Sequence, residues 1–127
     1  MAAHRRLDVK FNRGKNRDVT VAAFVDRNIL DEASIGDSAA ELFKLVEEPG
    51  HVKIVLNFSK VEVMATAVLG TLIKLDKKIK AIGGDLKLCH IRPEIHKVFE
   101  ITKLDKLFDI HRDEITALVA FDAGPAR

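Results

Sequence analysis

Residues 51–84 of the chain read HVKIVLNFSKVEVMATAVLGTLIKLDKKIKAIGG, and two hydrophobic patterns in this stretch decide the fold. Residues 51–58 carry apolar side chains at alternate positions, and Val55 adds apolar character to the opposite face. This pattern predicts a central strand that is buried on both faces. Residues 66–82 carry apolar side chains at helical spacing opposite a lysine-rich face, which predicts an amphipathic helix.

The predicted helix of residues 66–82 has a defined inner face and a defined end. We expect Asp76 to lie on the outer face with the lysines. Gly83-Gly84 follows the helix and supplies the positive φ that a helix C-terminus commonly needs. The inner face is expected to hold Leu69, Leu72, Ile73, Ile79 and Ile82.

Strand and helix patterns also alternate before this stretch. Residues 19–25 form a short apolar run typical of a buried strand, and we expect a shorter strand at residues 7–11 to pair with it across a turn-prone segment. A helical pattern then begins at Ser34, the expected N-cap, and Pro49-Gly50 ends it. The N-terminal part therefore predicts two strands followed by a helix.

The same alternation continues to the C-terminus, and it predicts a strand at residues 85–90, a helix from Pro93 to about Thr102, a short strand near residues 108–110 and a helix at residues 113–121. Strands and helices at these spacings imply right-handed crossovers and a mainly parallel sheet. The fold class is therefore α/β, with a mainly parallel or mixed sheet of four to five strands packed against about four helices. We expect one domain over residues 1–127, with its core between about residues 7 and 121.

The composition is that of a globular protein, because 47% of the residues are hydrophobic and 31% are charged. The 21 Lys and Arg residues are interspersed with 19 Asp and Glu residues, so no concentrated basic face indicates a nucleic-acid partner. Cys89 stands alone, which excludes an internal disulfide and is typical of a reducing compartment. Residues 1–8 lack the apolar stretch of a signal peptide, and no apolar run is long enough for a bilayer span. We expect a cytoplasmic protein without a membrane partner.

Motifs for catalysis, metals or cofactors are mostly absent from the sequence. Serines, histidines and aspartates are numerous enough for a triad, but no serine lies in a nucleophile-elbow context. The isolated Gly36, Gly50 and Gly70 do not form a phosphate-binding loop. Cys89 and His90 are adjacent in a predicted strand and would point to opposite faces, so we expect Cys89 to be a small buried residue rather than a metal ligand. Solvated ion pairs with nearby lysines are the simplest interpretation of four carboxylates, Glu94, Glu100, Asp105 and Asp109. We expect no catalytic residue, metal or cofactor.

Residues 59–68 combine small side chains with a hydroxyl, Thr66, at the expected start of a helix. We expect the neighbouring apolar side chains of Met64 and Val68 to be exposed. The Thr66 oxygen can act as a plain N-cap that accepts from amides one turn further on. It can also act as a switch, because phosphorylation adds about −1.5 to −2 charges at pH 7. Chemistry alone leaves both alternatives open.

Residues 53–72, KIVLNFSKVEVMATAVLGTL, resemble the strand–loop–helix core of STAS domains. In those proteins an Asp-Ser-Ser-Gly-Leu-Gly stretch follows a Leu-Asp-Phe-Ser-x-Val strand. Residues 83–95, GGDLKLCHIRPEI, and residues 98–108, VFEITKLDKLF, resemble the second signature of the family. The resemblance extends from about Val19 to Ile110.

The resemblance implies an anti-sigma factor antagonist that binds an anti-sigma factor, itself a protein kinase of the GHKL ATPase type. It places the phosphoacceptor on Thr66, with a phosphatase reversing the modification. Apart from the resemblance, we expect a monomer or a weak homodimer, since the N-terminal strand could pair between chains. The partner surface would comprise Glu62, Met64, Ala65, Thr66, Ala67 and Val68, with Asp26, Arg27, Asn28 and Asp31 from the neighbouring loop.

Three positions depart from the family motif, because Ala65 replaces its Asp, Ala67 its second Ser and Val68 its following Gly. Two alternatives therefore stay open. One is a STAS scaffold or transport-associated module that is never phosphorylated. The other is a small nucleotide-binding enzyme that uses a pocket at the carboxyl ends of the strands.

Overall fold

The computed structural model describes residues 7–12, 19–30, 32–47 and 53–122, which form an α/β fold around one mixed sheet. The sheet has five strands in the order β1-β2-β4-β6-β7. Strand β1 is antiparallel to β2, and the other neighbouring pairs are parallel. The bounds of these strands are β1 Leu7–Asn12, β2 Val19–Phe24, β4 Lys53–Asn57, β6 Asp85–Cys89 and β7 Asp109–His111. The predicted fold class and the antiparallel start are confirmed.

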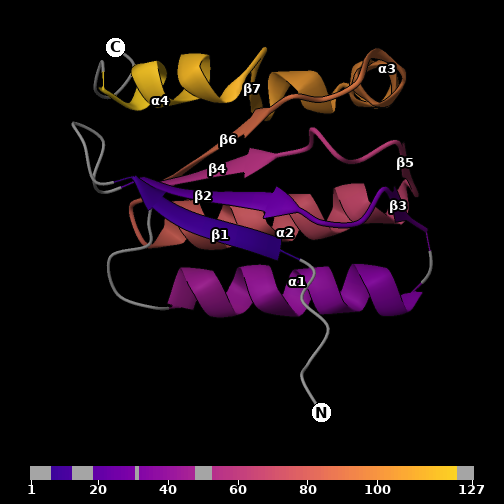
Figure 1. Cartoon of the computed structure of the whole chain (residues 1–127), viewed down its shortest axis with the longest axis horizontal. Coiled ribbons are helices and arrows are strands. Elements are labelled where there is room, and N and C mark those ends of the chain that lie inside the picture. Colours follow the sequence, from indigo (N-terminus) through magenta and orange to yellow (C-terminus); the bar gives the residue numbers. More distant parts are fainter. Residues whose placement is uncertain (1–6, 13–18, 31, 48–52, 123–127) are drawn as a thin grey trace.

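The helices cover both faces of the sheet. Two helices lie side by side on one face, and α4 lies on the other (Figure 1). The described helices are α1 Glu32–Glu47, α2 Ala67–Ala81, α3 Pro93–Ile101 and α4 Glu114–Asp122, with a short 3-10 turn at Leu104–Lys106. Because α1 and α2 lie on one face and connect successive parallel strands in the same direction across the sheet, both crossovers have the same hand.

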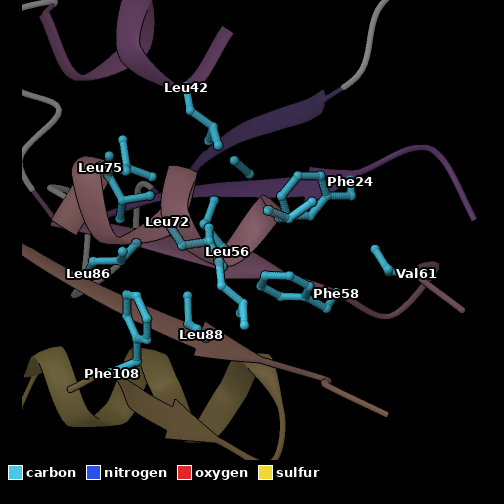
Figure 2. Close-up of a cluster of buried hydrophobic side chains, with 14 of the residues drawn as sticks. Phe24, Leu42, Leu56, Phe58, Val61, Leu72, Leu75, Leu86, Leu88 and Phe108 are labelled. Carbon is cyan, nitrogen blue, oxygen red and sulfur yellow. The ribbon is translucent and has the colours of Figure 1, made fainter. Parts of the chain in front are cut away.

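The central strand β4 supplies the core on both sides, as its sequence predicts. Ile54 and Leu56 are fully buried in the main core cluster. Figure 2 shows Leu56 among the side chains under α1 and α2. Val55 points to the opposite face and packs with a smaller cluster under α4 that includes Cys89 and Phe121. Alternate burial on the two faces is what fixes the register of a central strand, because a slip of one residue would reverse both faces.

Helix ends follow local chemistry that the sequence reveals only in part. Gly83 has φ 82°, and the amides of Gly83 and Gly84 donate to Lys80 O at 3.1 Å and Ile79 O at 2.9 Å, which is a Schellman motif. The first helix begins at Glu32, so Ser34 lies inside it and is not its N-cap. Apolar spacing marks the inner face of a helix and does not mark a polar first turn, which explains the error.

Two side chains, one in α2 and one at its C-cap, lie opposite to their predicted faces. Asp76 is buried and its Oδ2 lies 3.4 Å from Lys80 Nζ, whereas Ile82 is 50% exposed. Ile82 is the C-cap, with φ −101° and ψ 15°, so its side chain no longer follows the inner face of the helix. Thr102, the predicted end of α3, is its C-cap and is exposed, and its hydroxyl donates to Val98 O at 2.8 Å.

Candidate partner-binding site

Two connections at one edge of the sheet are joined by a short parallel ladder. Strands β2 and β4 are parallel neighbours, so the chain leaves both at the same edge. There β3 (Asn28–Ile29) pairs with β5 (Val63–Met64), to one side of the main sheet (Figure 1). We call this ladder, with the flanking residues Asp26 to Leu30 and Glu62 to Ala67, the platform. The sequence predicts that these two loops are neighbours, but it does not predict the ladder.

Backbone hydrogen bonds hold the two halves of the platform together. The amides of Glu62 and Val63 both donate to Arg27 O, at 2.7 and 3.1 Å. The amide of Ala65 donates to Ile29 O at 2.9 Å. These bonds satisfy main-chain groups that would otherwise need water, and they fix the position of residues 62–65 relative to residues 27–29.

Buried side chains anchor the platform from below. Ile29 and Val61 are almost completely buried and belong to the main core. Figure 2 shows Val61 beyond Phe58, where the chain has left β4. The amide of Val61 donates to Phe58 O at 2.9 Å, and that of Ser59 donates to Asn57 Oδ1 at 2.8 Å. The chain therefore turns tightly after β4 before it pairs with β3.

Thr66 is an exposed residue at the start of α2, but it is not a side-chain cap. Its φ of −61° and ψ of −24° are helical, and it makes no capping hydrogen bond within the described residues. A side chain that reaches the first amides of a helix usually requires extended dihedral angles at the N-cap. The predicted cap is therefore not formed. The first turn closes instead through the amides of Val68 and Leu69, which donate to Ala65 O and Thr66 O at 3.0 Å each.

The apolar part of this surface differs from the predicted one. Val68 is only 4% exposed and Met64 is half-buried against the core, so the predicted exposure of these two side chains is wrong. Val63 at 47% and Leu30 at 53% are the large exposed apolar side chains of the platform. Alternation explains the exchange, because β5 turns Val63 outward and Met64 inward.

The other predicted partner residues have varied exposure. Arg27, Asn28, Glu62, Thr66 and Ala67 are exposed, whereas Asp26 and Ala65 are half-buried. Asp31 lies outside the described residues. The structure thus brings both predicted segments to one surface, with Val68 beneath it.

Arg92 is a neighbour of the platform that the sequence interpretation missed. Its Nε donates to Val61 O at 3.1 Å, and its Nη2 lies 3.8 Å from Glu62 Oε2. Arg27 Nε lies at the same distance from the same oxygen. A signal was available, because Arg92 follows β6, whose carboxyl end lies next to that of β4.

A second charged cluster lies on the α4 side of the sheet. Lys87 is buried, and its Nζ lies 2.6 Å from Asp109 Oδ2, 3.2 Å from Asp85 Oδ2 and 4.6 Å from the centre of the Phe121 ring. Burial lowers the pKa of Lys87, but the hydrogen bond to Asp109 and the charge of Asp85 outweigh it and hold this pKa above 10.5. Burial raises the pKa of Asp109, but Lys87 and the nearby His111 hold that pKa below 3.8. The sequence interpretation paired Asp109 with nearby lysines in solvent. The structure pairs it with the buried Lys87 of β6 instead.

His90 and Asn57 hold the start of α4. His90 has φ 58°, and its Nε2 accepts from the Glu114 amide at 3.3 Å. Asn57 Nδ2 donates to Glu114 Oε1 at 3.1 Å.

Within the residues that the structure describes, no group of three His, Cys, Asp or Glu side chains could hold a metal ion. Over the same ranges, the helices are too short or too polar to cross a membrane.

Comparison with known proteins gives the class of this chain. The family model of the STAS domain matches residues 18–117, so the chain belongs to the STAS domain family. This confirms the resemblance drawn from residues 53–72 and from the second signature.

Several similar proteins within the STAS family are named as anti-sigma factor antagonists. BtrV of Bordetella bronchiseptica, provisionally named an anti-sigma factor antagonist, is 25% identical over 101 residues, which cover 80% of this chain and 86% of that protein. An anti-sigma-factor antagonist (STAS) domain protein from Planctomyces limnophilus has a similar structure, with 20% identity, a TM-score of 0.77, and coverage of 93% of this chain and 98% of that one. The phosphorylated form of the Bacillus cell fate determinant SpoIIAA is also similar, with 16% identity, a TM-score of 0.65, and coverage of 91% and 98%.

Proposed function

We propose that this chain is a cytoplasmic anti-sigma factor antagonist that binds an anti-sigma factor through the platform and acts by binding rather than by catalysis. The observation that carries the proposal is the exposed Thr66 next to a hydrogen-bonded platform with outward Val63 and Leu30, in a STAS domain. An outward apolar pair with polar surroundings suits a modest, transient protein interface.

Phosphorylation of Thr66 would regulate this binding. A kinase of the GHKL type, the anti-sigma factor itself, would transfer the γ-phosphoryl group of ATP to Thr66 Oγ1, with release of the hydroxyl proton and ADP. A phosphatase would use water to remove it as inorganic phosphate. The positive end of the α2 dipole tolerates the added charge in the unbound protein. A docked partner must desolvate it, at a cost of several kcal/mol, and about 1.4 kcal/mol already changes affinity tenfold.

A constitutive binding module is the second candidate, and Ala65 favours it. Ala65 stands where the family motif has an aspartate, and in α2, whose whole length is described, the first turn has no acidic residue. A kinase that reads the motif carboxylate would find none here. In this alternative the same platform binds its partner without modification of Thr66.

Two measurements test the proposal. Calorimetric titration of the purified protein with each anti-sigma factor of its own cell should find one that binds, and Thr66→Glu should weaken that binding at least tenfold while Thr66→Ala does not. Phosphopeptide mass spectrometry on cells under growth and stress should find phosphate on Thr66. Equal binding by both variants, with Thr66 observed only unmodified, would leave the constitutive module. Absence of any binding anti-sigma factor would overturn the function itself.

A further inference from the structure

Three charged side chains from separate parts of the chain converge beside β5. Arg27, Glu62 and Arg92 follow the carboxyl ends of β2, β4 and β6, which are parallel neighbours in the sheet. Both guanidinium groups approach the same atom, Glu62 Oε2, at 3.8 Å each. One carboxylate oxygen therefore faces two cations, and this group of three carries a net positive charge.

Neither arginine is saturated by Glu62. A distance of 3.8 Å is too long for a hydrogen bond, so each contact is an ion pair without a formed N–H···O bond. A guanidinium has five N–H donors. Within the described residues, the Arg92 guanidinium makes one hydrogen bond, from its Nε to Val61 O, and the Arg27 guanidinium makes none. The outward N–H groups of both arginines thus remain available to a second anion.

The two arginines differ in how firmly they are held. The bond to Val61 O fixes Arg92 at the start of α3, next to Pro93, and leaves its Nη atoms near Glu62. The Arg27 side chain is 76% exposed, and within the described part of the chain its contact is with Glu62. A planar fork that is already positioned loses less conformational entropy when it binds a carboxylate.

We propose that Arg27 and Arg92 form a receptor for a carboxylate of the protein partner, and that Glu62 positions the two guanidinium groups for it. This inference rests on the proposed function for the identity of the partner as an anti-sigma factor. It adds the chemistry of the contact: an acidic side chain of the partner enters between the arginines, while apolar side chains beside it cover Val63 and Leu30. Guanidinium–carboxylate pairs provide geometric specificity as well as attraction, which suits the recognition of one acidic residue.

The first test needs no anti-sigma factor. The side-chain Nε–Hε signals of the arginines are followed by NMR while the protein is titrated with an acetylated, amidated tetraglutamate peptide. The matched control is Arg112, an exposed arginine whose Nε lies 3.6 Å from Asp113 Oδ2. We expect saturable shifts at Arg27 and Arg92 that weaken as salt is added, with little change at Arg112 and none with tetraglutamine. Equal shifts at all three arginines, or none, would overturn the receptor.

The second test uses the anti-sigma factor that binds the wild-type protein. Arg27→Gln and Arg92→Gln should each weaken binding about tenfold, with Arg112→Gln as the neutral control. Arg27→Gln alone decides the outcome if Arg92→Gln disturbs the fold. Glu62→Gln should weaken binding by less than either arginine variant, because it removes the charge that positions the guanidinium groups but keeps all of their N–H donors. A loss of affinity in Glu62→Gln equal to that of the arginine variants would mean that Glu62 contacts the partner itself and would contradict the proposal.

The two failures are distinguishable. If no anti-sigma factor binds but the tetraglutamate peptide shifts Arg27 and Arg92, the proposed function fails and the receptor remains. If an anti-sigma factor binds equally well to the wild-type protein and to the arginine variants, the function remains and the receptor fails.

Discussion

Two charged clusters of this protein have opposite compositions and opposite environments. On the α4 side, the cation of Lys87 lies between two carboxylates and is buried, with its shortest contact 2.6 Å long. At the platform, the carboxylate of Glu62 lies between two exposed arginines at 3.8 Å. The short contacts and the burial of Lys87 make the first cluster a stabilising element, because its ammonium group is already paired and is shielded from a partner. Long contacts and exposure leave the second free to exchange partners.

The largest expected effect comes from breaking the buried cluster. Lys87→Ala leaves Asp85 and Asp109 without their cation and removes the contact with Phe121. Removing one partner of a buried pair costs about 3–5 kcal/mol, and because both carboxylates are about half exposed we expect about 2–3 kcal/mol. Urea unfolding measures the loss. Arg112→Ala, at an exposed ion pair, is the control and should change stability by less than about 0.5 kcal/mol.

A matched pair of valines sharpens the comparison within the platform region. Val68→Ala empties a buried site in the core and should lower the free energy of unfolding by about 2 kcal/mol. The same substitution at the half-exposed Val63 should change it by less than about 0.5 kcal/mol while weakening the binding of an anti-sigma factor. Thermal unfolding and calorimetric titration separate the two. Similar losses of stability at both positions would contradict the described burial.

Acid and alkali should both weaken the buried cluster. The folded-state pKa of Asp109 lies below 3.8, so its contribution to stability is present above that pH and is lost as the pH falls further. The folded-state pKa of Lys87 lies above 10.5, so its contribution is full below that pH and is lost as the pH rises through its folded value. The free energies of unfolding of the wild type and of Asp109→Asn should therefore be similar in strong acid and differ near neutral pH. A constant difference at every pH would refute this linkage.

The smallest effect is expected at the exposed cluster. Glu62→Gln removes two long ion pairs between exposed groups, and such pairs contribute about 0–1 kcal/mol at most. We expect the free energy of unfolding to change by less than about 0.5 kcal/mol, with any change disappearing at high salt. Denaturant unfolding at low and high ionic strength measures it. A loss of unfolding free energy as large as that of Lys87→Ala would contradict the distinction drawn between the two clusters.

The long elements were predictable from the sequence because burial imposes a period on them. Strand β4 and helix α2 carry clear patterns, and both form within a few residues of their predicted bounds. The two-residue strands β3 and β5 were not predictable, because their pairing depends on main-chain hydrogen bonds that leave no period in the side chains. They form because two parallel strands end at the same edge of the sheet.

The site was predictable as a location and less so as a set of side chains. The resemblance to STAS domains brought Thr66 and Arg27 to one surface, but it could not show that Val68 points inward and Val63 outward. Arg92 was missed because it lies far from the platform residues in the sequence. Lys87 was missed because lysine is rarely buried, and its partner Asp109 becomes adjacent only when β6 pairs with β7.

The two hydrogen bonds that Arg27 O accepts affect the rate at which the protein binds a partner. Because two amides hold residues 62–63 to this carbonyl and Ile29 and Val61 anchor the ladder, the platform needs little rearrangement when a partner arrives. Encounter is then limited by diffusion and orientation rather than by the ordering of a loop, and opposite charges accelerate it. We therefore expect an association rate constant that falls steeply with ionic strength, while the dissociation rate constant stays nearly unchanged.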